Sequence, residues 1–175
     1  GVRPQRAAEV APALADRLLT IGAYGYTADS FLAALRNAKV TALIDVRMRR
    51  GMRGSTYAWA NATRLRSLLE GHGVAYGHAR QLAPTAEIRA LQRERDASEG
   101  AAKRSRTELD RAFVEMYRTL ILDPLDPAVA MQDLRTVGEV PALFCVETRP
   151  AACHRSLVAD WISDQVPVVV EHLTP

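Results

Sequence analysis

The chain has 175 residues, of which 48% are hydrophobic and 25% are charged. These proportions are typical of a globular domain and exclude a disordered or fibrous chain. No apolar run approaches the roughly 18 residues that a membrane span needs, no secretory signal is recognisable, and the two cysteines are too few for a disulfide-stabilised scaffold. We therefore expect a cytoplasmic protein with reduced thiols and no membrane partner, and the net charge of +3 does not by itself require nucleic acid.

The N-terminal part of the chain predicts an arm followed by a strand and a helix. Residues 1–17 are rich in alanine and contain two prolines, which favours an arm or a short helix. Residues 18–175 are expected to form a single domain. It begins with a strand over 18–22, and Thr27 is the expected cap of a helix over 28–39.

The middle of the chain continues this alternation. A β-branched and apolar strand is predicted over 40–47, and a leucine-bearing helix that ends at Gly71 leads to a third strand over 74–78. Residues 80–106 carry charges of both signs, which favours a solvated helix or a mobile excursion. Apolar residues then recur every three or four positions and predict a helix over 107–122.

The C-terminal part predicts a helix over 128–137, a strand over 140–146, a helix over 153–165 and a last strand over 166–170. Alternating strands and helices without hairpin signals favour a parallel sheet, because parallel strands need crossover connections. We expect an α/β fold, a Rossmann-like three-layer sandwich with a mostly parallel five-stranded sheet.

Polar residues mark the carboxyl ends of the predicted strands, where open parallel sheets bind their ligands. They are Thr20 and Gly22, Asp45 and Arg47, His78, Cys145 and Glu147, and His172, and they are joined by Cys153, His154 and Arg155 at the start of a helix. We expect them to converge in one crevice. Thr20, Gly22, Arg47, Arg155 and His172 are the predicted ligand- and anion-binding residues.

The stretch from Cys145 to Arg155 has the highest density of reactive groups. A helix N-terminus favours anions and acidifies a thiol, so Cys153 is a candidate nucleophile, with a structural role equally weighted. His154 is assigned with it to catalysis. Cys145 is expected to be an ordinary buried strand residue.

Metal binding is the less favoured interpretation of the same stretch. Cys145, Glu147, Cys153, His154 and His172 are chemically suitable zinc ligands. Their spacing matches no standard two-pair pattern, so we predict neither a metal nor another cofactor.

Two carboxylates are candidate acid–base groups. Asp45 and Arg47 are two residues apart on one strand and so share a face. The carboxylate could serve as a base in the crevice, or the two side chains could form a structural ion pair, and Glu147 allows the same two interpretations.

The loop after the second strand predicts contact with nucleic acid. Arg49, Arg50 and Arg53 are followed by Tyr57 and Trp59, and single-stranded nucleic acids are bound by such mixtures of guanidinium groups and aromatic rings. A solvated loop is the alternative.

Several of these segments together resemble the domain-of-unknown-function family 488 over about residues 18 to 173. They are Thr20-Ile-Gly22, Asp45-Val-Arg47, the region from Tyr76 to Leu82, Cys145-Val-Glu147, Cys153-His-Arg155 and His172. The resemblance implies a compact α/β fold with a polar site made by these motifs, and it implies no particular reaction.

Three loops depart from the pattern of that family. The chain has Ala23-Tyr24-Gly25 where a Ser or Thr usually follows the first glycine, and an arginine-rich loop where a Pro/Ser-bearing loop usually follows Asp-Val-Arg. It has Leu82-Ala83-Pro84 in place of Leu-Gly-Gly. A ligand common to the whole family is therefore in doubt at these loops.

Taken together, the motifs predict an enzyme that acts on an anionic nucleotide or nucleic-acid substrate, as a hydrolase or transferase, with an N-glycosidic bond as one candidate for the bond attacked. Arg47 and Arg155 would hold charge while Asp45 or Glu147 does acid–base work. A non-catalytic nucleotide- or nucleic-acid-binding module, and cysteine- or metal-dependent chemistry at Cys153, are the alternatives. The oligomeric state is left open.

Overall fold

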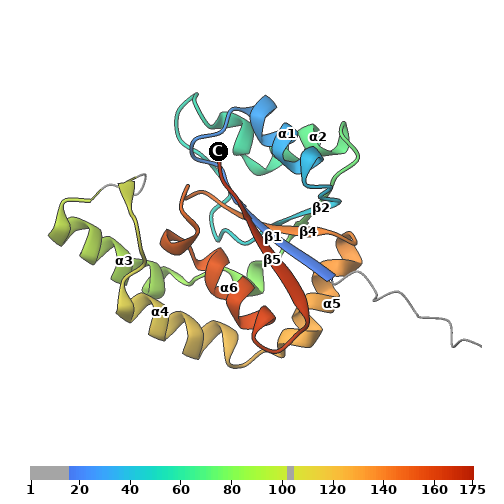
Figure 1. Cartoon of the computed structure of the whole chain (residues 1–175). Coiled ribbons are helices and arrows are strands. Elements are labelled where there is room, and N and C mark those ends of the chain that lie inside the picture. The colour runs from blue at the N-terminus through green and yellow to red at the C-terminus, as the bar shows by residue number, and fades with distance from the viewer. Residues whose placement is uncertain (1–15, 102–104) are drawn as a thin grey trace, which may run out of the picture.

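A computed structural model describes residues 16–101 and 105–175. Its centre is a five-stranded sheet in the order β3-β2-β4-β1-β5, with every neighbouring pair parallel (Figure 1). The strands are β1 (Asp16–Gly22), β2 (Ala42–Asp45), β3 (Ala75–His78), β4 (Pro141–Cys145) and β5 (Val168–Leu173). The predicted α/β fold with a five-stranded parallel sheet is confirmed.

Helices cover both faces of this sheet. They are α1 (Ala28–Asn37), α2 (Ala62–Glu70), α3 (Ala86–Glu99), α4 (Arg111–Tyr117), α5 (Pro127–Val137) and α6 (His154–Ser163). In Figure 1, α1 and α2 lie above the sheet, α5 and α6 lie below it, and α3 lies beside α4 at the edge of the lower layer. None of the described helices has the length and apolar character that crossing a membrane requires.

Local capping groups explain where several helices begin. Thr27, the predicted cap of α1, accepts a hydrogen bond from the backbone N–H of Ser30 at 3.1 Å. Asp110 and Asp126 cap α4 and α5 in the same way. Such side chains satisfy backbone donors that have no partner within the helix.

The predicted elements are present, with shifted ends. The helix expected over 107–122 begins only at Arg111, because Asp110 occupies its cap, and it passes into a π-helical turn (Arg118–Leu122). Residues 1–15 of the expected arm lie outside the described part of the chain. Asp16 and Arg17 belong to β1 instead of the arm, and they pair along β5.

The core explains the nearly continuous apolar strands. Every residue of β2 and β4 is buried, as parallel strands covered by helices on both faces require. Because all five strands run the same way, their carboxyl ends meet at one rim of the sheet. The candidate site lies at this rim.

Candidate functional site

A cavity of about 310 Å³ opens beside the carboxyl ends of β2 and β4. Its lining comes from the loop after β2, from α3 and the start of α4, and from the turn between β4 and α6. The lining includes Arg47, Met48, Arg49, Met52, Pro84, Arg89, Gln92, Arg93, Arg106, Leu109, Phe113, Cys145, Glu147, Cys153 and His154. The volume is that of a small-molecule site.

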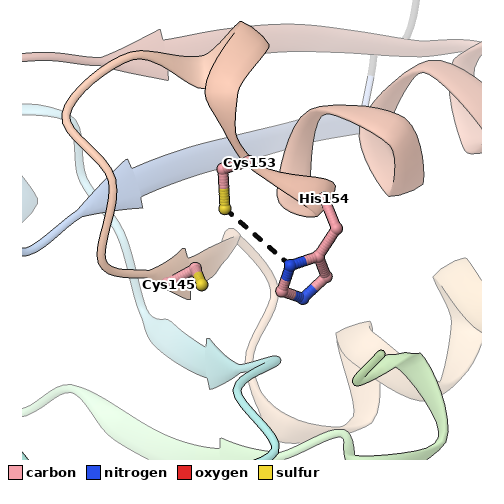
Figure 2. Close-up of side chains that lie close together, drawn as sticks. All are labelled: Cys145, Cys153 and His154. Atoms are coloured by element: carbon pink, nitrogen blue, oxygen red, sulfur yellow. Dashed lines mark hydrogen bonds between the residues drawn. The ribbon is translucent and has the colours of Figure 1, made fainter. Parts of the chain in front are cut away.

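Two thiols and an imidazole converge at this cavity (Figure 2). Cys145 is the last residue of β4, and Cys153 and His154 open α6. All three side chains are buried, and neither cysteine is disulfide-bonded. The Cys153 sulfur lies 3.9 Å from Nδ1 of His154.

The surroundings of Cys153 favour the thiolate. Burial acts to raise its pKa, but a hydrogen bond from Cys145 and the positive charges of Arg155 and His154 together lower the pKa of Cys153 well below its ordinary value. For His154, burial acts to lower the pKa, yet the nearby Cys153 sulfur raises it above the ordinary value overall. The two groups therefore favour a thiolate beside an imidazolium.

A backbone contact fixes the orientation of the imidazole. Nε2 of His154 lies 2.9 Å from the carbonyl oxygen of Val46. Because a carbonyl only accepts hydrogen bonds, Nε2 carries a proton and donates, so Nδ1 is the atom that faces Cys153. Tyr117, whose ring centre lies 5.5 Å from that of His154, is itself held by its hydroxyl on the carbonyl of Leu82.

Five arginines line the cavity: Arg47, which is paired with Asp45, and Arg49, Arg89, Arg93 and Arg106. Burial, and then repulsion from Arg49 and Arg93, lower the pKa of Arg89. Nε of Arg89 is buried and has no hydrogen-bond partner in the described residues. Like charges held together in this way favour an anionic ligand.

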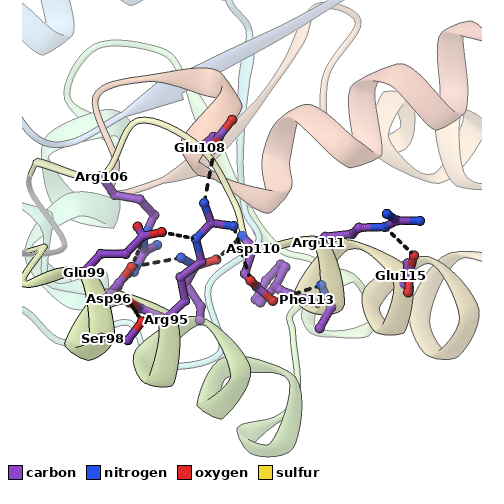
Figure 3. Close-up of polar contacts among 12 residues, drawn as sticks. Arg95, Asp96, Ser98, Glu99, Arg106, Glu108, Asp110, Arg111, Phe113 and Glu115 are labelled. Atoms are coloured by element: carbon purple, nitrogen blue, oxygen red, sulfur yellow. Dashed lines mark hydrogen bonds and ion pairs between the residues drawn. The ribbon is translucent and has the colours of Figure 1, made fainter.

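A polar network joins α3 to Arg106 and to the start of α4 (Figure 3), and Arg106 extends it to the β4–α6 turn. Arg106 pairs with Asp96 of α3 and, at 3.3 Å, with Glu147. Gln92 of α3 accepts a hydrogen bond from the backbone N–H of Asp110 at 2.7 Å. These contacts hold α3, the segment before α4 and the β4–α6 turn around one hollow.

Asp45 lies outside this cavity. Its carboxylate is fully buried, accepts from Nε and Nη2 of Arg47 at 2.9 and 2.8 Å, and also accepts from the hydroxyl of Tyr76 at 2.6 Å. The register explains its position. Asp45 pairs with Phe144, so it shares the face of Phe144 and points away from the face of Cys145. This geometry favours the structural ion pair over the acid–base role.

Arg155 holds the turn between β4 and α6 and does not line the cavity. It is fully buried, and its Nη1 and Nη2 donate to the carbonyls of Glu147 and Thr148 at 2.7 and 3.3 Å. The end of β1 lies very close to this turn because residue 22 is a glycine. A Cβ at Gly22 would lie 2.0 Å from the Glu147 carbonyl oxygen. The predicted anion-binding role of both residues stays a prediction.

Thr20 and His172 form a separate pair. The Thr20 hydroxyl lies 2.7 Å from Nδ1 of His172, across the β1–β5 register. Burial, and then the charge of Arg155, lower the pKa of His172. His78, at the end of β3, instead bonds the carbonyl of Arg47, so these strand ends do not reach the thiols.

The predicted nucleic-acid residues are dispersed. Of the five, Arg49 lines the cavity, whereas Arg50 bonds the hydroxyl of Tyr76 at 3.3 Å and Arg53 is exposed. Tyr57 accepts from the backbone N–H of Gly25, and Trp59 packs with its ring centre 4.8 Å from that of Phe31. The two aromatic rings thus belong to a cluster beside α1.

Within residues 16–101 and 105–175, Cys145, Cys153 and His154 form a group that could hold a metal. Their ligand atoms lie within 4.8 Å of one another, and two thiolates with an imidazole suit a thiophilic ion such as zinc. A backbone carbonyl on the far nitrogen of His154 is also usual for a metal ligand. The expectation that the site holds no metal stays a prediction.

A family model described as "Domain of unknown function DUF488" matches residues 27–162. The chain belongs to the DUF488 family. No curated protein and no solved structure matches it. The match includes the Asp45, Cys145 and Cys153 motifs of the DUF488 domain, while Thr20, Gly22 and His172 lie outside the matched residues.

Sequence reasoning missed the part of this DUF488 site that comes from residues 80–106. That segment was expected to be solvated or mobile, but α3 brings Arg89, Gln92 and Arg93 to the cavity wall, and Arg106 follows it. One signal was present. Arg89 and Arg93 are like charges four residues apart, an arrangement that destabilises an isolated helix.

Proposed function

We propose that the chain is an enzyme that binds an anionic substrate in the arginine-lined cavity and attacks it with the thiolate of Cys153. The observation that supports this proposal is that Cys153, with its lowered pKa, faces a cavity lined by five arginines and Glu147. A thiolate is the reactive form of cysteine, and fixed positive charge concentrates anions beside it.

The substrate class follows from the rest of the lining. Met48, Met52, Pro84, Leu109 and Phe113 form an apolar wall beside the arginines, so the cavity suits a molecule with an anionic group and an uncharged body. A nucleotide has both, and it is the class that the sequence predicts. We therefore propose a nucleotide-sized phosphate or carboxylate compound.

The mechanism uses Cys153, His154 and Glu147. The Cys153 sulfur forms a bond to the electrophilic atom of the substrate while the bond to the leaving group breaks, and the leaving group takes the proton from the His154 imidazolium. An N-glycosidic bond is one bond that such an attack would cleave. We assign to Glu147 the acid–base work of the second step, in which water or an acceptor releases the enzyme.

We do not extend the proposal to a nucleic-acid-binding module. That interpretation needs Tyr57 and Trp59 to offer their faces to bases, whereas both rings pack in the cluster beside α1. Arg49 is shared by both interpretations and does not separate them.

The charge of an alkylating reagent tests the proposal. Iodoacetate and iodoacetamide attack the same sulfur, but only iodoacetate carries a carboxylate. Relative to the same rate ratio for glutathione, we expect Cys153 to prefer iodoacetate by about tenfold, because the arginines attract it. Peptide mapping by mass spectrometry identifies the modified cysteine.

The matched variants are Arg89→Gln with Arg93→Gln, and Arg111→Gln as control. Arg111 lies on α4 with its side chain 91% exposed and paired with Glu115. We expect the double variant to lose most of the preference of Cys153 for iodoacetate over iodoacetamide, and the control variant to keep this preference. A wild-type ratio equal to that of glutathione, or no protection of Cys153 by any nucleotide in a screen, overturns the proposal.

A further inference from the structure

Cys145, the second thiol of the cavity, has no chemical role in the proposed function. Cys145 is buried, lines the same cavity, and forms a hydrogen bond with the Cys153 sulfur. The two thiol side chains therefore lie side by side at one wall of the cavity.

The two sulfurs are close enough to join after a small movement. The metal-ligating atoms of Cys145, Cys153 and His154 all lie within 4.8 Å of one another, whereas a disulfide needs about 2.05 Å between sulfurs. Cys145 ends β4 and Cys153 precedes the first residue of α6. Both side chains thus come from the two ends of one turn, 146–152.

The burial of Cys153 limits which oxidants can reach its sulfur. Cys153 is only 1% exposed, so the disulfide of another protein cannot approach it without rearrangement, whereas a molecule that fits the cavity, such as a small peroxide, can. The arginine lining favours a peroxide that is itself anionic, and it also stabilises the oxygen anion that departs when the O–O bond breaks.

We propose that Cys153 and Cys145 form a dithiol pair that reduces small hydroperoxides, with Cys153 as the attacking and Cys145 as the resolving thiol. The proposal rests on the reactivity of Cys153 in the proposed function and adds a second substrate class. Two observations support the dithiol pair: the Cys145 thiol lies beside Cys153, and the cavity is confined. Without a second thiol, oxidation of Cys153 would stop at a sulfenic acid.

The chemistry balances in two steps. The Cys153 thiolate attacks the outer oxygen of the hydroperoxide, an S–O bond forms, the O–O bond breaks, and the departing oxygen takes the proton from His154. Sulfur is thereby oxidised by two electrons to a sulfenic acid. The Cys145 sulfur then attacks Cys153, an S–S bond forms, the S–O bond breaks, and hydroxide leaves as water with the proton of Cys145. An external dithiol returns the pair to the reduced state.

The experiment oxidises the reduced, full-length protein with one equivalent of hydrogen peroxide in the presence of a chelator. We expect both thiols to disappear from a thiol titration and the intact mass to fall by two hydrogen atoms. Peptide mapping is expected to find Cys145 joined to Cys153. Loss of one thiol with a gain of oxygen, and no disulfide, overturns the proposal.

Two variants assign the roles. Cys145→Ser is expected to consume peroxide but to stop at a sulfenic acid on Cys153, which dimedone traps. Cys153→Ser is expected to consume peroxide about a hundredfold more slowly, because the thiolate is lost. A sulfenic acid on Cys145 in place of Cys153 would overturn the assignment of Cys153 as the attacking thiol. Circular dichroism spectra check that both variants are folded.

The wild-type measurements separate this proposal from the proposed function. A preference for iodoacetate without disulfide formation overturns the dithiol pair alone, whereas an unreactive Cys153 in both assays overturns both proposals. A third outcome is a purified protein with one equivalent of a metal ion and with thiols that react only after the ion is removed. It would assign the three residues to a metal centre and overturn the dithiol pair.

Discussion

Cys153 occupies an unusual position for a cysteine. It is the N-cap of α6, a place usually taken by Ser, Thr, Asp or Asn, and its side chain makes no capping hydrogen bond. The sulfur instead faces His154 and Cys145. The residue thus gives up helix stability at a position where the helix N-terminus and neighbouring cations favour an anion.

The reactivity of Cys153 is expected to depend on pH in a specific way. Only the thiolate is alkylated, and the pKa of Cys153 lies well below its ordinary value of 9.0. The rate of alkylation by neutral iodoacetamide should therefore stay constant as the pH falls through 9 and decline only at a much lower pH. A rate–pH profile with peptide mapping measures this.

His154→Asn is the comparison for that profile. It removes a positive charge and a hydrogen bond that both lower the pKa of Cys153, so the midpoint of the profile should move to higher pH. A wild-type midpoint near 9, or a variant midpoint that does not rise, would contradict the assigned thiolate–imidazolium pair.

At the scale of elements, α3 and α4 decide the character of the cavity. Together they form the outer wall, and a polar contact between them is made by Arg95 of α3, which pairs at 3.3 Å with Asp110, the cap of α4. This contact helps to fix the position of α3, whose Arg89 and Arg93 line the same cavity as the two thiols. A shift of α3 would remove the positive lining without any change at Cys153.

Asp110→Ala tests this arrangement. The change removes the cap of α4, which accepts from the backbone N–H groups of Ala112 and Phe113, and also the partner of Arg95. We expect a loss of about 1 kcal/mol in the free energy of unfolding, measured by urea denaturation, together with a weaker preference of Cys153 for iodoacetate.

The control is Asp126→Ala, which removes the corresponding cap of α5. Asp126 does not line the cavity, so a similar loss of stability with an unchanged preference for iodoacetate is expected. If both variants altered the preference equally, general destabilisation would explain the effect and the wall formed by α3 and α4 would not.

At the scale of the whole molecule, the site depends on the close approach of β1 to the chain after β4. The backbone N–H groups of Ala23 and Tyr24 bond the carbonyls of Cys145 and Val146 at 3.1 and 2.9 Å. Gly22 allows this approach, since there is no room for a Cβ. Arg155 of α6 donates hydrogen bonds to the next two carbonyls, those of Glu147 and Thr148. These contacts fix the turn that carries Glu147.

Gly22→Ala is expected to destabilise the protein by about 3 kcal/mol, because overpacking forces the backbone apart. It should also displace Glu147 and its bond to Arg155. Gly71→Ala is the matched control: the nearest atoms to its Cβ lie at 3.6 and 3.8 Å, so its effect on the urea midpoint should be small. Equal effects of the two changes would contradict the close approach.

The sequence by itself determined the order and type of the elements. Apolar runs, helical periodicity and local caps such as Thr27 are properties of neighbouring residues, so the strands and most helices could be predicted, although their ends shifted by a few residues. The proximity of Cys153 and His154 was predictable for the same reason, since the two residues are adjacent at the start of one helix.

Only the tertiary structure decided which of these groups share the cavity. The strand order and the β2–β4 register place Asp45 on the face of Phe144 and not on that of Cys145, and α3 brings Arg89 and Arg93 to the cavity of two thiols that lie more than fifty residues away in the chain. Such contacts join residues that are distant in sequence, and no local pattern records which faces will meet. The physical reason is that side-chain alternation fixes two faces for each strand, while packing alone chooses what lies opposite each face.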